Sequence, residues 1–573
     1  MDLRLAYVQV GKTERDDSAC GSAVRTGTLA KAGWCKTPTG RILYTCDISG
    51  AQGEFVIDCR TARPRNLQAI FWMTAILFSC DRIAAVPPPT VIVSVSTKNA
   101  TQLEPGFAGY NSPFMATGVK ATDPRLLPLL KQLSPGFLKY PAGTRTNAFD
   151  WTSGLYREEW IDRSDGFFGN ESRQTNQVLT VTGPQLVRDV YSLARDTGAA
   201  GLIVQVNTFT DSPESAGNFA RYAKDHNIRV FVWQLGAEPT QFPKVFPRAS
   251  DYASKMRPFA DAIRSADPNA KISISLGIAR EPFRWKPDLD WDDDLAKYEP
   301  RYWDLLTYHQ YPRVRGSDSE LMGQLNEVLV SQTTRYVVDH IEPRFGKTPL
   351  VITESDPGSP LPQRPEDTMS GATVAQPGTS MVGTLYGGIW SAEYILRLSV
   401  LGQMKHVGIH QLLGAAGIQL SDAHLTEIFA AYEAKKTIET RSLDYGFFMS
   451  ATGVAYGAAA AAINASTHVC PTSVKGGGTA ATTTAATVPA VYAQAYRKGR
   501  NFHVVVTNKG PNRELISIQI DGRPVSNRLG VVTVTGPGPS ARNAPGKQDV
   551  GSAASNTLGP VPMPPYSVVT ISW

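Results

Sequence analysis

The stretch Arg229-Val-Phe-Val-Trp-Gln-Leu-Gly-Ala-Glu238-Pro joins a short apolar run to an acid placed just after it. A second stretch, Pro349-Leu-Val-Ile-Thr-Glu354, repeats this arrangement. Strands of a parallel sheet that is covered on both faces read as continuous apolar runs. In a (β/α)8 barrel, the groups that carry function lie at the carboxyl ends of such strands. The two stretches therefore predict two barrel strands that bring Glu238 and Glu354 to one mouth.

Outward from these two runs, strand-like and helix-like stretches alternate, which is typical of a βα protein. Segments with one apolar helical face, such as 184–196, separate the runs. We expect eight barrel strands, at residues 106–110, 136–140, 201–207, 229–235, 271–276, 303–308, 349–353 and 406–412.

Beyond about residue 430 the helical pattern stops, and short strands separated by Gly and Pro turns follow. This pattern predicts an antiparallel β-sandwich. The fold class is therefore α/β, with a (β/α)8 TIM barrel over 89–430 and a C-terminal β-sandwich over 431–573. The β-branched strand at 90–96 precedes the barrel and could pair with the sandwich instead.

Residues 1–88 read as an irregular leader that contains a signal-like segment at 63–86. A basic start, a short apolar core and a small-residue exit are typical of a secretory signal, and the apolar core is too short for a membrane span. We expect secretion, with residues 1–66 either an upstream extension or a native region. Sequons at Asn99, Asn170 and Asn464 are compatible with a secreted glycoprotein.

Composition excludes several classes of function. The net charge of +6 is spread without long basic runs, which argues against nucleic-acid binding and permits an anionic substrate. Five of the six cysteines lie in the first eighty residues, without the C-x-x-C spacing of a metal site. The chain has no G-x-S-x-G elbow, Walker loop or H-E-x-x-H motif. We expect no metal and no cofactor, and a solvated loop at 292–294.

Two carboxylates that face each other across one pocket are the working parts of glycoside hydrolysis. A retaining enzyme holds them about 5–5.5 Å apart, with one protonated and the other ionised. The plainer alternative is that Glu238 and Glu354 are helix caps or surface charges. Their shared position after buried strands favours the catalytic interpretation.

Other polar residues lie at predicted strand ends. Tyr308, His309 and Tyr311 close the sixth strand, where they could bind the nucleophile or a sugar, or form a packed aromatic rim. Asn207 ends the third strand and suits either a sugar contact or a turn. Gly143, after the second strand, would let the backbone approach a ligand.

These residues resemble glycoside hydrolase family 79 of clan A, which includes β-glucuronidases and heparanases. Trp233-Gln-Leu-Gly-Ala-Glu238-Pro resembles the acid/base motif, Thr353-Glu354 the nucleophile, and Tyr308-His309-Gln-Tyr311 the strand-six element. Leu138-Lys-Tyr-Pro-Ala-Gly143-Thr resembles the strand-two motif, and the resemblance covers 88–573.

The resemblance implies a retaining enzyme with Glu238 as general acid/base and Glu354 as nucleophile. It places Tyr311 near the nucleophile and Asn207 near the sugar, and it suggests a β-linked uronic acid as substrate. The alternatives are a non-catalytic carbohydrate-binding protein on the same scaffold and a hydrolase for a neutral sugar.

One departure from the family pattern concerns the substrate site. The family has Asn before the acid/base, where it usually binds the sugar 2-hydroxyl, and this chain has Ala237. Hydrogen bonds to that hydroxyl strengthen in the transition state. Ala237 therefore indicates a weak enzyme, an altered substrate or a glycan-binding relic. Ala142 also replaces the second glycine of the strand-two motif.

Overall fold

The computed structural model describes residues 90–163, 169–279, 286–358, 380–484 and 486–573, together with the backbone of four strands between residues 20 and 57. The chain divides into two compact units, Met1–Pro87 and Pro88–Trp573. The signal-like segment at 63–86 lies outside the described residues.

The first unit corrects the expectation of an irregular leader, because it contains a four-stranded antiparallel sheet in the order β1-β2-β3-β4. Its strands are β1 (Cys20–Val24), β2 (Ala30–Lys36), β3 (Ile42–Ile48) and β4 (Ala51–Ile57). The sequence here alternates β-forming runs with turn-forming residues, and Ser49-Gly50 separates β3 from β4 by two residues. A two-residue connection of this kind is a hairpin signal.

The second unit confirms the predicted barrel: eight parallel strands close in the order β11-β12-β13-β14-β15-β16-β7-β8. Each expected strand is present, with ends shifted by a few residues. The strands are β7 (Ala108–Asn111), β8 (Phe137–Tyr140), β11 (Gly201–Val206), β12 (Val230–Leu235), β13 (Ile272–Ser275), β14 (Leu305–Gln310), β15 (Leu350–Ser355) and β16 (Met404–Ile409).

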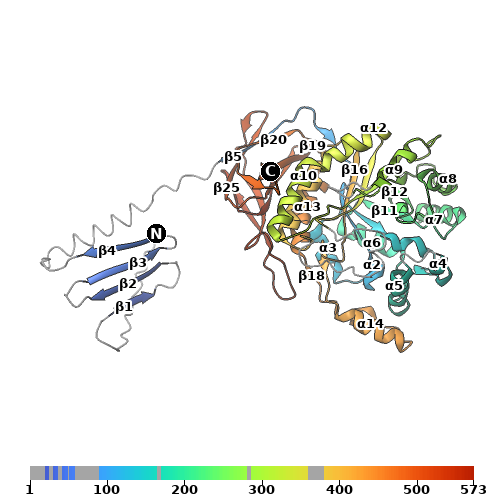
Figure 1. The fold of residues 1–573 in the computed structure, drawn as a ribbon, viewed down its shortest axis with the longest axis horizontal. Helices are drawn as coiled ribbons and strands as arrows, with labels where there is room; N and C mark the ends of the chain where they lie inside the picture. The colour runs from blue at the N-terminus through green and yellow to red at the C-terminus, as the bar shows by residue number, and fades with distance from the viewer. Residues whose placement is uncertain are drawn as a thin grey trace. The chain divides into compact units, whose positions relative to one another are not determined.

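Helices follow the strands along the chain and surround the barrel (Figure 1). Among the described residues, the α-helices of eight or more residues are α3 (Leu126–Leu133), α5 (Gly169–Thr182), α6 (Val187–Thr197), α7 (Pro213–Asp225), α8 (Ala249–Ala266), α9 (Lys286–Ala296), α10 (Asp318–Ser331), α13 (Leu385–Ser399), α14 (Ala423–Glu433) and α15 (Ala451–Asn464). No helix among the described residues is long and apolar enough to cross a membrane.

The boundary expected near residue 430 is wrong, because α14 and α15 both extend past it. Helix α15 contains an alanine-rich run at residues 458–462. Most of its residues are buried, including Ala455, Tyr456 and Ala459. A helix that is buried on nearly all sides shows no apolar stripe, so its periodicity gave no signal. Alanine nevertheless has the highest helix propensity, and Ser450 caps the helix by accepting a bond from Gly453 N.

The β-sandwich consists of two sheets. One sheet has seven strands in the order β28-β27-β30-β24-β23-β19-β6, and the other has five strands, β20-β5-β25-β26 with β29 on β25. The strands are β5 (Thr90–Val95), β6 (Thr101–Gln102), β19 (His468–Cys470), β20 (Thr472–Lys475), β23 (Val491–Lys498), β24 (Asn501–Asn508), β25 (Glu514–Ile520), β26 (Arg523–Pro524), β27 (Leu529–Thr535), β28 (Gly551–Thr557), β29 (Val561–Met563) and β30 (Ser567–Ser572).

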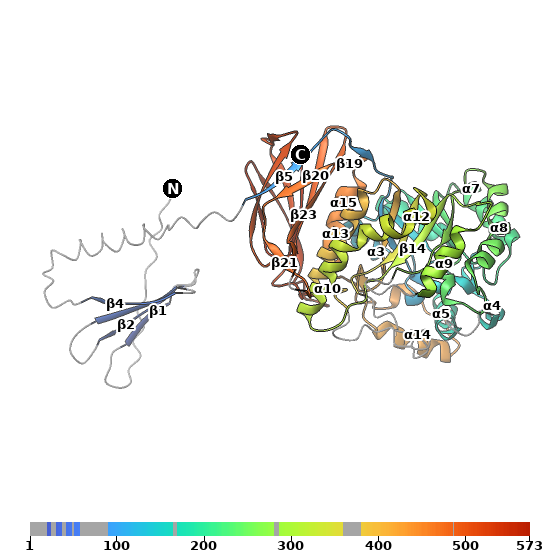
Figure 2. The same cartoon turned by 45° about the horizontal axis from the view of Figure 1, so that its top comes forward.

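Strand β5 belongs to the sandwich, where it pairs parallel to β25 and antiparallel to β20. In Figure 2 this blue strand lies among the orange and red strands from the end of the chain. Its alternate residues Val91 and Val93 are fully buried against Val504, Ile516 and Val569. The chain therefore begins its second unit in the sandwich before it enters the barrel.

Two local expectations change in the folded chain. The acidic run at 292–294 lies in α9 rather than in a solvated loop, and Asp292 is fully buried. Its carboxylate accepts bonds from Gly277 N and His340 Nε2, each at 2.8 Å. The sequon residue Asn464 bonds both backbone groups of Ala108, so its amide is part of the fold. Of the sequon side chains described, Asn99 is the exposed one.

Candidate active site

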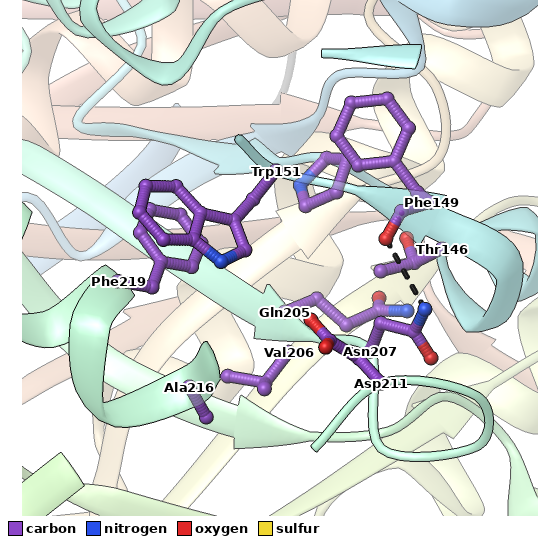
Figure 3. A pocket seen from close by; sticks show the side chains of 10 residues that line it. Thr146, Phe149, Trp151, Gln205, Val206, Asn207, Asp211, Ala216 and Phe219 are labelled. Atoms are coloured by element: carbon purple, nitrogen blue, oxygen red, sulfur yellow. Dashed lines mark hydrogen bonds between the residues drawn. The ribbon is translucent and has the colours of Figure 1, made fainter. Parts of the chain in front are cut away.

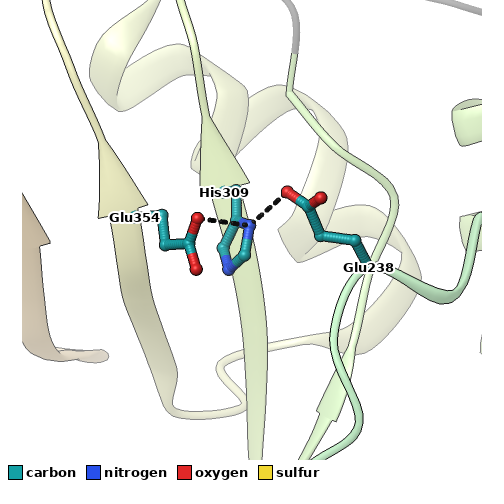
Figure 4. A group of neighbouring side chains, drawn as sticks. All are labelled: Glu238, His309 and Glu354. Carbon is teal, nitrogen blue, oxygen red and sulfur yellow. Dashed lines mark hydrogen bonds and ion pairs between the residues drawn. The ribbon is translucent and has the colours of Figure 1, made fainter. Parts of the chain in front are cut away.

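Glu238 and Glu354 converge at the carboxyl ends of β12 and β15. One carboxylate oxygen of each lies with a ring nitrogen of His309 in a group whose atoms are all within 4.8 Å of one another. Figure 4 shows both acids pointing toward the imidazole, which comes from β14 between them. Both acids are buried. A separation of this size is close to the ~5 Å of a retaining carboxylate pair.

Glu354 is surrounded by donors. Lys139 Nζ lies 2.9 Å from Oε1, and the Tyr311 hydroxyl donates to Oε2 at 2.8 Å. His410 Nδ1 lies 3.6 Å from the same oxygen. Burial alone would raise the pKa of Glu354, but the charge of the paired Lys139 ammonium outweighs burial and holds this pKa well below its usual range. Glu354 is therefore ionised.

Glu238 has different partners. His309 Nδ1 lies 2.6 Å from its Oε1, and the Gln241 amide also donates to its carboxylate. Its backbone is left-handed, with φ of 44°. A non-glycine residue in this region carries strain of about 1 kcal/mol or more, and such strain concentrates at functional sites. The two acids thus occupy unequal environments, one beside a lysine and the other beside a histidine.

Lys139 belongs to the candidate site, although the sequence motifs did not single it out. It lies in the middle of β8, fully buried, and its ammonium group pairs with Glu354. Buried charges in proteins are almost always paired. The signal was available, because a lysine within the apolar strand Phe137–Tyr140 needs an acidic partner inside the barrel.

For Tyr308, the structure favours the packing alternative over a place beside the two acids. Successive side chains of a strand point to opposite faces, and His309 points into the barrel toward Glu238. Tyr308 therefore points outward, where its ring packs on Tyr336 with centroids 5.3 Å apart. Tyr311, two residues after His309, reaches Glu354 as expected. His309 and Tyr311 therefore belong to the candidate site, and Tyr308 belongs to the packing against Tyr336.

The side chain of Asn207 holds the turn that follows β11, and its hydrogen-bonding groups are not free to bind a sugar. Its amide group donates to Phe149 O and Thr210 Oγ1, and its carbonyl accepts from the backbone of Phe209 and Thr210. Both ends of the amide are therefore occupied. Figure 3 shows Asn207 beside Gln205, Asp211 and Trp151 in the small cavity that these side chains line.

The Gly143 backbone faces open space. Its φ is +75°, and a side chain built there would meet nothing within 4 Å. This is the environment expected where a ligand approaches the backbone. The preceding Ala142 has φ of 154°, in a region that residues with a side chain rarely adopt.

Replacing Ala142 with glycine is expected to leave stability unchanged or to raise it by up to about 1 kcal/mol, because the strain at φ 154° disappears. Ala108→Gly in β7 is the matched control, since Ala108 is also buried and has no positive φ, and it should cost about 1 kcal/mol. Urea unfolding of both variants measures the difference. Equal losses of unfolding free energy in the two variants would show that the backbone at position 142 carries no strain.

Ala237, in the place of the family asparagine, is fully buried. Its carbonyl accepts a bond from Asn147 Nδ2 at 3.3 Å. Position 237 therefore offers a backbone group and a methyl group, and no side-chain hydrogen bond, to the space beside Glu238.

The spacing of Glu238, His309 and Glu354 would also suit a metal ion. Each carboxylate oxygen of Glu354 already has a donor, Lys139 or Tyr311, and an ammonium group opposes a second cation by charge. Both ring nitrogens of His309 are also engaged, with Glu238 and Thr353. The donor set fits a hydrogen-bonded acid pair better than a metal site.

Comparison of the sequence with protein-family models and with curated proteins finds no match. Solved structures do match. A GH51 arabinofuranosidase from Xanthomonas axonopodis pv. citri superposes with a TM-score of 0.60 at 15% identity, over 84% of this chain and 99% of that one. AbfB, a family 51 α-L-arabinofuranosidase from Bifidobacterium longum, gives 0.60 at 14% identity over the same shares. The likeness establishes the TIM-barrel fold with its additional β-domain.

Proposed function

We propose that this protein is a retaining glycoside hydrolase in which Glu354 is the nucleophile and Glu238 the general acid/base. The observation that carries the proposal is the pair of buried carboxylates within 4.8 Å at one barrel mouth, in unequal surroundings. The fold shared with GH51 arabinofuranosidases supports it, since catalytic groups of TIM barrels lie at this face.

Each acid has the surroundings that its step requires. Glu354, ionised by Lys139, attacks the anomeric carbon and forms a covalent glycosyl ester, while the Glu238 proton passes to the leaving oxygen. Glu238, now ionised, takes a proton from water, which attacks the ester and releases the sugar. Tyr311 keeps Glu354 oriented through its hydroxyl. These steps use the side chains alone.

For the substrate we propose a β-linked glycoside, with a β-glucuronide as the first choice, because the ordered motifs resemble family 79. Secretion belongs to the same proposal and rests on the segment at 63–86. A neutral-sugar hydrolase is the nearest alternative, and the shared fold with arabinofuranosidases makes α-L-arabinofuranoside its first substrate to test.

A panel of 4-nitrophenyl glycosides tests the proposal. We expect turnover of the β-D-glucuronide, loss of that turnover in Glu354→Gln, and initial release of the β-anomer by NMR. Faster turnover of an arabinofuranoside or xyloside would show that the substrate is a neutral sugar. Binding of glycans without any turnover would make the protein a carbohydrate-binding relic.

Replacing Ala237 with asparagine is expected to raise glucuronidase turnover by about 10–100-fold, because the new amide can bind the 2-hydroxyl in the transition state. Ala237→Leu, which is similar in size to asparagine but makes no hydrogen bond, is the matched control and should lose activity. The measurement is kcat/KM on the aryl glucuronide. If both variants lose activity equally, position 237 is shaped for a different substrate.

A further inference from the structure

A chain of buried hydrogen bonds leads from the backbone to Glu238 and determines the positions of its protons. It begins at Gln234 on β12, whose Nε2 donates to Gly236 O at 3.2 Å. The reverse orientation of this amide would place two carbonyl oxygens against each other. The carbonyl Oε1 of Gln234 must therefore face Thr353, whose hydroxyl lies 3.2 Å away.

The Thr353 hydroxyl has one proton and two lone pairs. The proton goes to Gln234 Oε1, which can only accept. The two remaining neighbours are Lys139 Nζ at 3.3 Å and His309 Nε2 at 3.0 Å. The ammonium of Lys139 can only donate, so it takes one lone pair. His309 Nε2 takes the other lone pair and must carry a hydrogen to do so.

The other ring nitrogen, His309 Nδ1, lies 2.6 Å from Glu238 Oε1. With Nε2 protonated, a neutral imidazole presents a bare lone pair to Glu238, and this lone pair forms a hydrogen bond only while Glu238 keeps its proton. The titratable groups around this imidazole are Glu238, Glu354, Tyr311, Lys139 and His410. Of these, Glu238 makes the shortest contact with His309.

We propose that Thr353 and Gln234 are positioning residues that lock His309 in its Nε2-protonated form and so keep the acid proton on Glu238. The inference rests on the proposed function for its catalytic meaning, whereas the hydrogen on Nε2 stands on the hydrogen bonds alone. The proton that Glu238 gives to the leaving group returns from water in the second step, and the histidine therefore ends each cycle as it began.

Thr353→Val keeps the shape of the side chain and removes the acceptor for Nε2–H. A buried N–H without a partner is costly, so Nε2 loses its proton to solvent and the Glu238 proton passes to Nδ1, which then bonds to the ionised carboxylate. We expect turnover of phenyl glycosides, whose leaving group needs the acid, to fall about 100-fold. Turnover of 2,4-dinitrophenyl glycosides, which need little acid assistance, should fall less than about 5-fold.

Two variants separate this role from a general effect on the barrel. Thr353→Ser keeps the hydroxyl and should restore the phenyl glycoside rate. Thr307→Val removes another buried hydroxyl of the barrel interior, which bonds Ser273 Oγ at 2.8 Å and has no bond to His309, and it should not change the ratio of the two rates. A uniform loss on both substrates in Thr353→Val would overturn the positioning role.

The tautomer itself is read without any substrate. In protein labelled with [15N]histidine, the His309 signals are assigned among the eight histidines by their loss in His309→Gln. We expect Nε2 to be protonated and Nδ1 bare in the wild type and in Thr353→Ser, and the reverse in Thr353→Val. A bare Nε2 or a protonated Nδ1 in the wild type, or an unchanged tautomer in Thr353→Val, would overturn the inference. Failure of the proposed function would instead leave the spectra as expected and show no glycosidase activity in the wild type.

Discussion

Replacing Glu354 with glutamine is expected to lower glycoside turnover by about 10⁴-fold or more, because an amide cannot form the glycosyl ester. Glutamine has the size of glutamate and still accepts a hydrogen bond from Lys139, but the buried ammonium loses its counter-charge, so the variant should also lose stability. The measurement is kcat on the best aryl glycoside of the panel, with circular dichroism to verify folding.

Asp292→Asn is the matched control for Glu354→Gln. Asp292 is also a buried carboxylate with a histidine partner, His340 at 2.8 Å, but it lies in α9, outside the candidate site. This variant should lose stability and keep the turnover of its folded fraction. Azide should restore activity to a Glu354→Ala variant, because it attacks the anomeric carbon in place of the missing carboxylate. The product is a glycosyl azide of inverted configuration. A Glu354→Gln variant with near-normal turnover would end the proposed mechanism.

The largest effect on stability is expected at Glu393, which joins α13 to the sandwich. Its buried carboxylate pairs with Lys509 Nζ at 2.6 Å and with Arg397 at 2.7 Å, and accepts from Thr507 at 2.9 Å. Glu393→Gln leaves the buried ammonium of Lys509 without its counter-charge. Removing one partner of a buried pair costs about 3–5 kcal/mol, which urea unfolding measures.

The contribution of Glu393 also depends on pH. Burial alone would raise the pKa of Glu393, but Lys509 and Arg397 lower it below its ordinary value of 4.5. A lowered carboxyl pKa gives stability that is present above pH 4.5 and is lost as pH falls further. In Glu393→Gln, the loss of stability below pH 4.5 should be smaller by the contribution of this carboxylate.

Two further variants test the explanation. Glu393→Gln combined with Lys509→Met should recover most of the loss, because the isolated charge is gone. Asp290→Asn breaks the exposed pair with Lys286, whose side chains are 58% and 81% exposed, and should cost at most about 1 kcal/mol. If Glu393→Gln costs no more than Asp290→Asn, the buried pair does not hold α13 to the sandwich.

Periodicity predicted the barrel because its eight strands are buried on both faces and therefore stand out as apolar runs. Periodicity did not predict elements that are buried on all sides or exposed along most of their length. Helix α15 is buried almost all round and showed no stripe. Strand β28 is exposed along most of its length and is made of small polar residues, so it showed no apolar alternation.

Within the site, the sequence predicted both acids at the barrel mouth, and the structure brings them together there, with Glu238 just after β12 and Glu354 near the end of β15. The sequence could not assign the faces of β14, since alternation fixes which residues share a face but not which face is inward. Tyr308 and His309 are neighbours and point to opposite faces, and only the tertiary contacts show that His309 is the inward one. The sequence permits two roles for Asn207, and its hydrogen bonds in the turn decide between them.

The sequence by itself determined that Glu238 and Glu354 lie at the ends of barrel strands, because strand order and apolar patterning are written along the chain. Only the tertiary structure decided their partners. Lys139, His309 and Thr353 come from three different strands, and no spacing along the chain encodes the angles at which a closed barrel brings their side chains together. The ionised state of Glu354 and the locked histidine beside Glu238 depend on those long-range contacts.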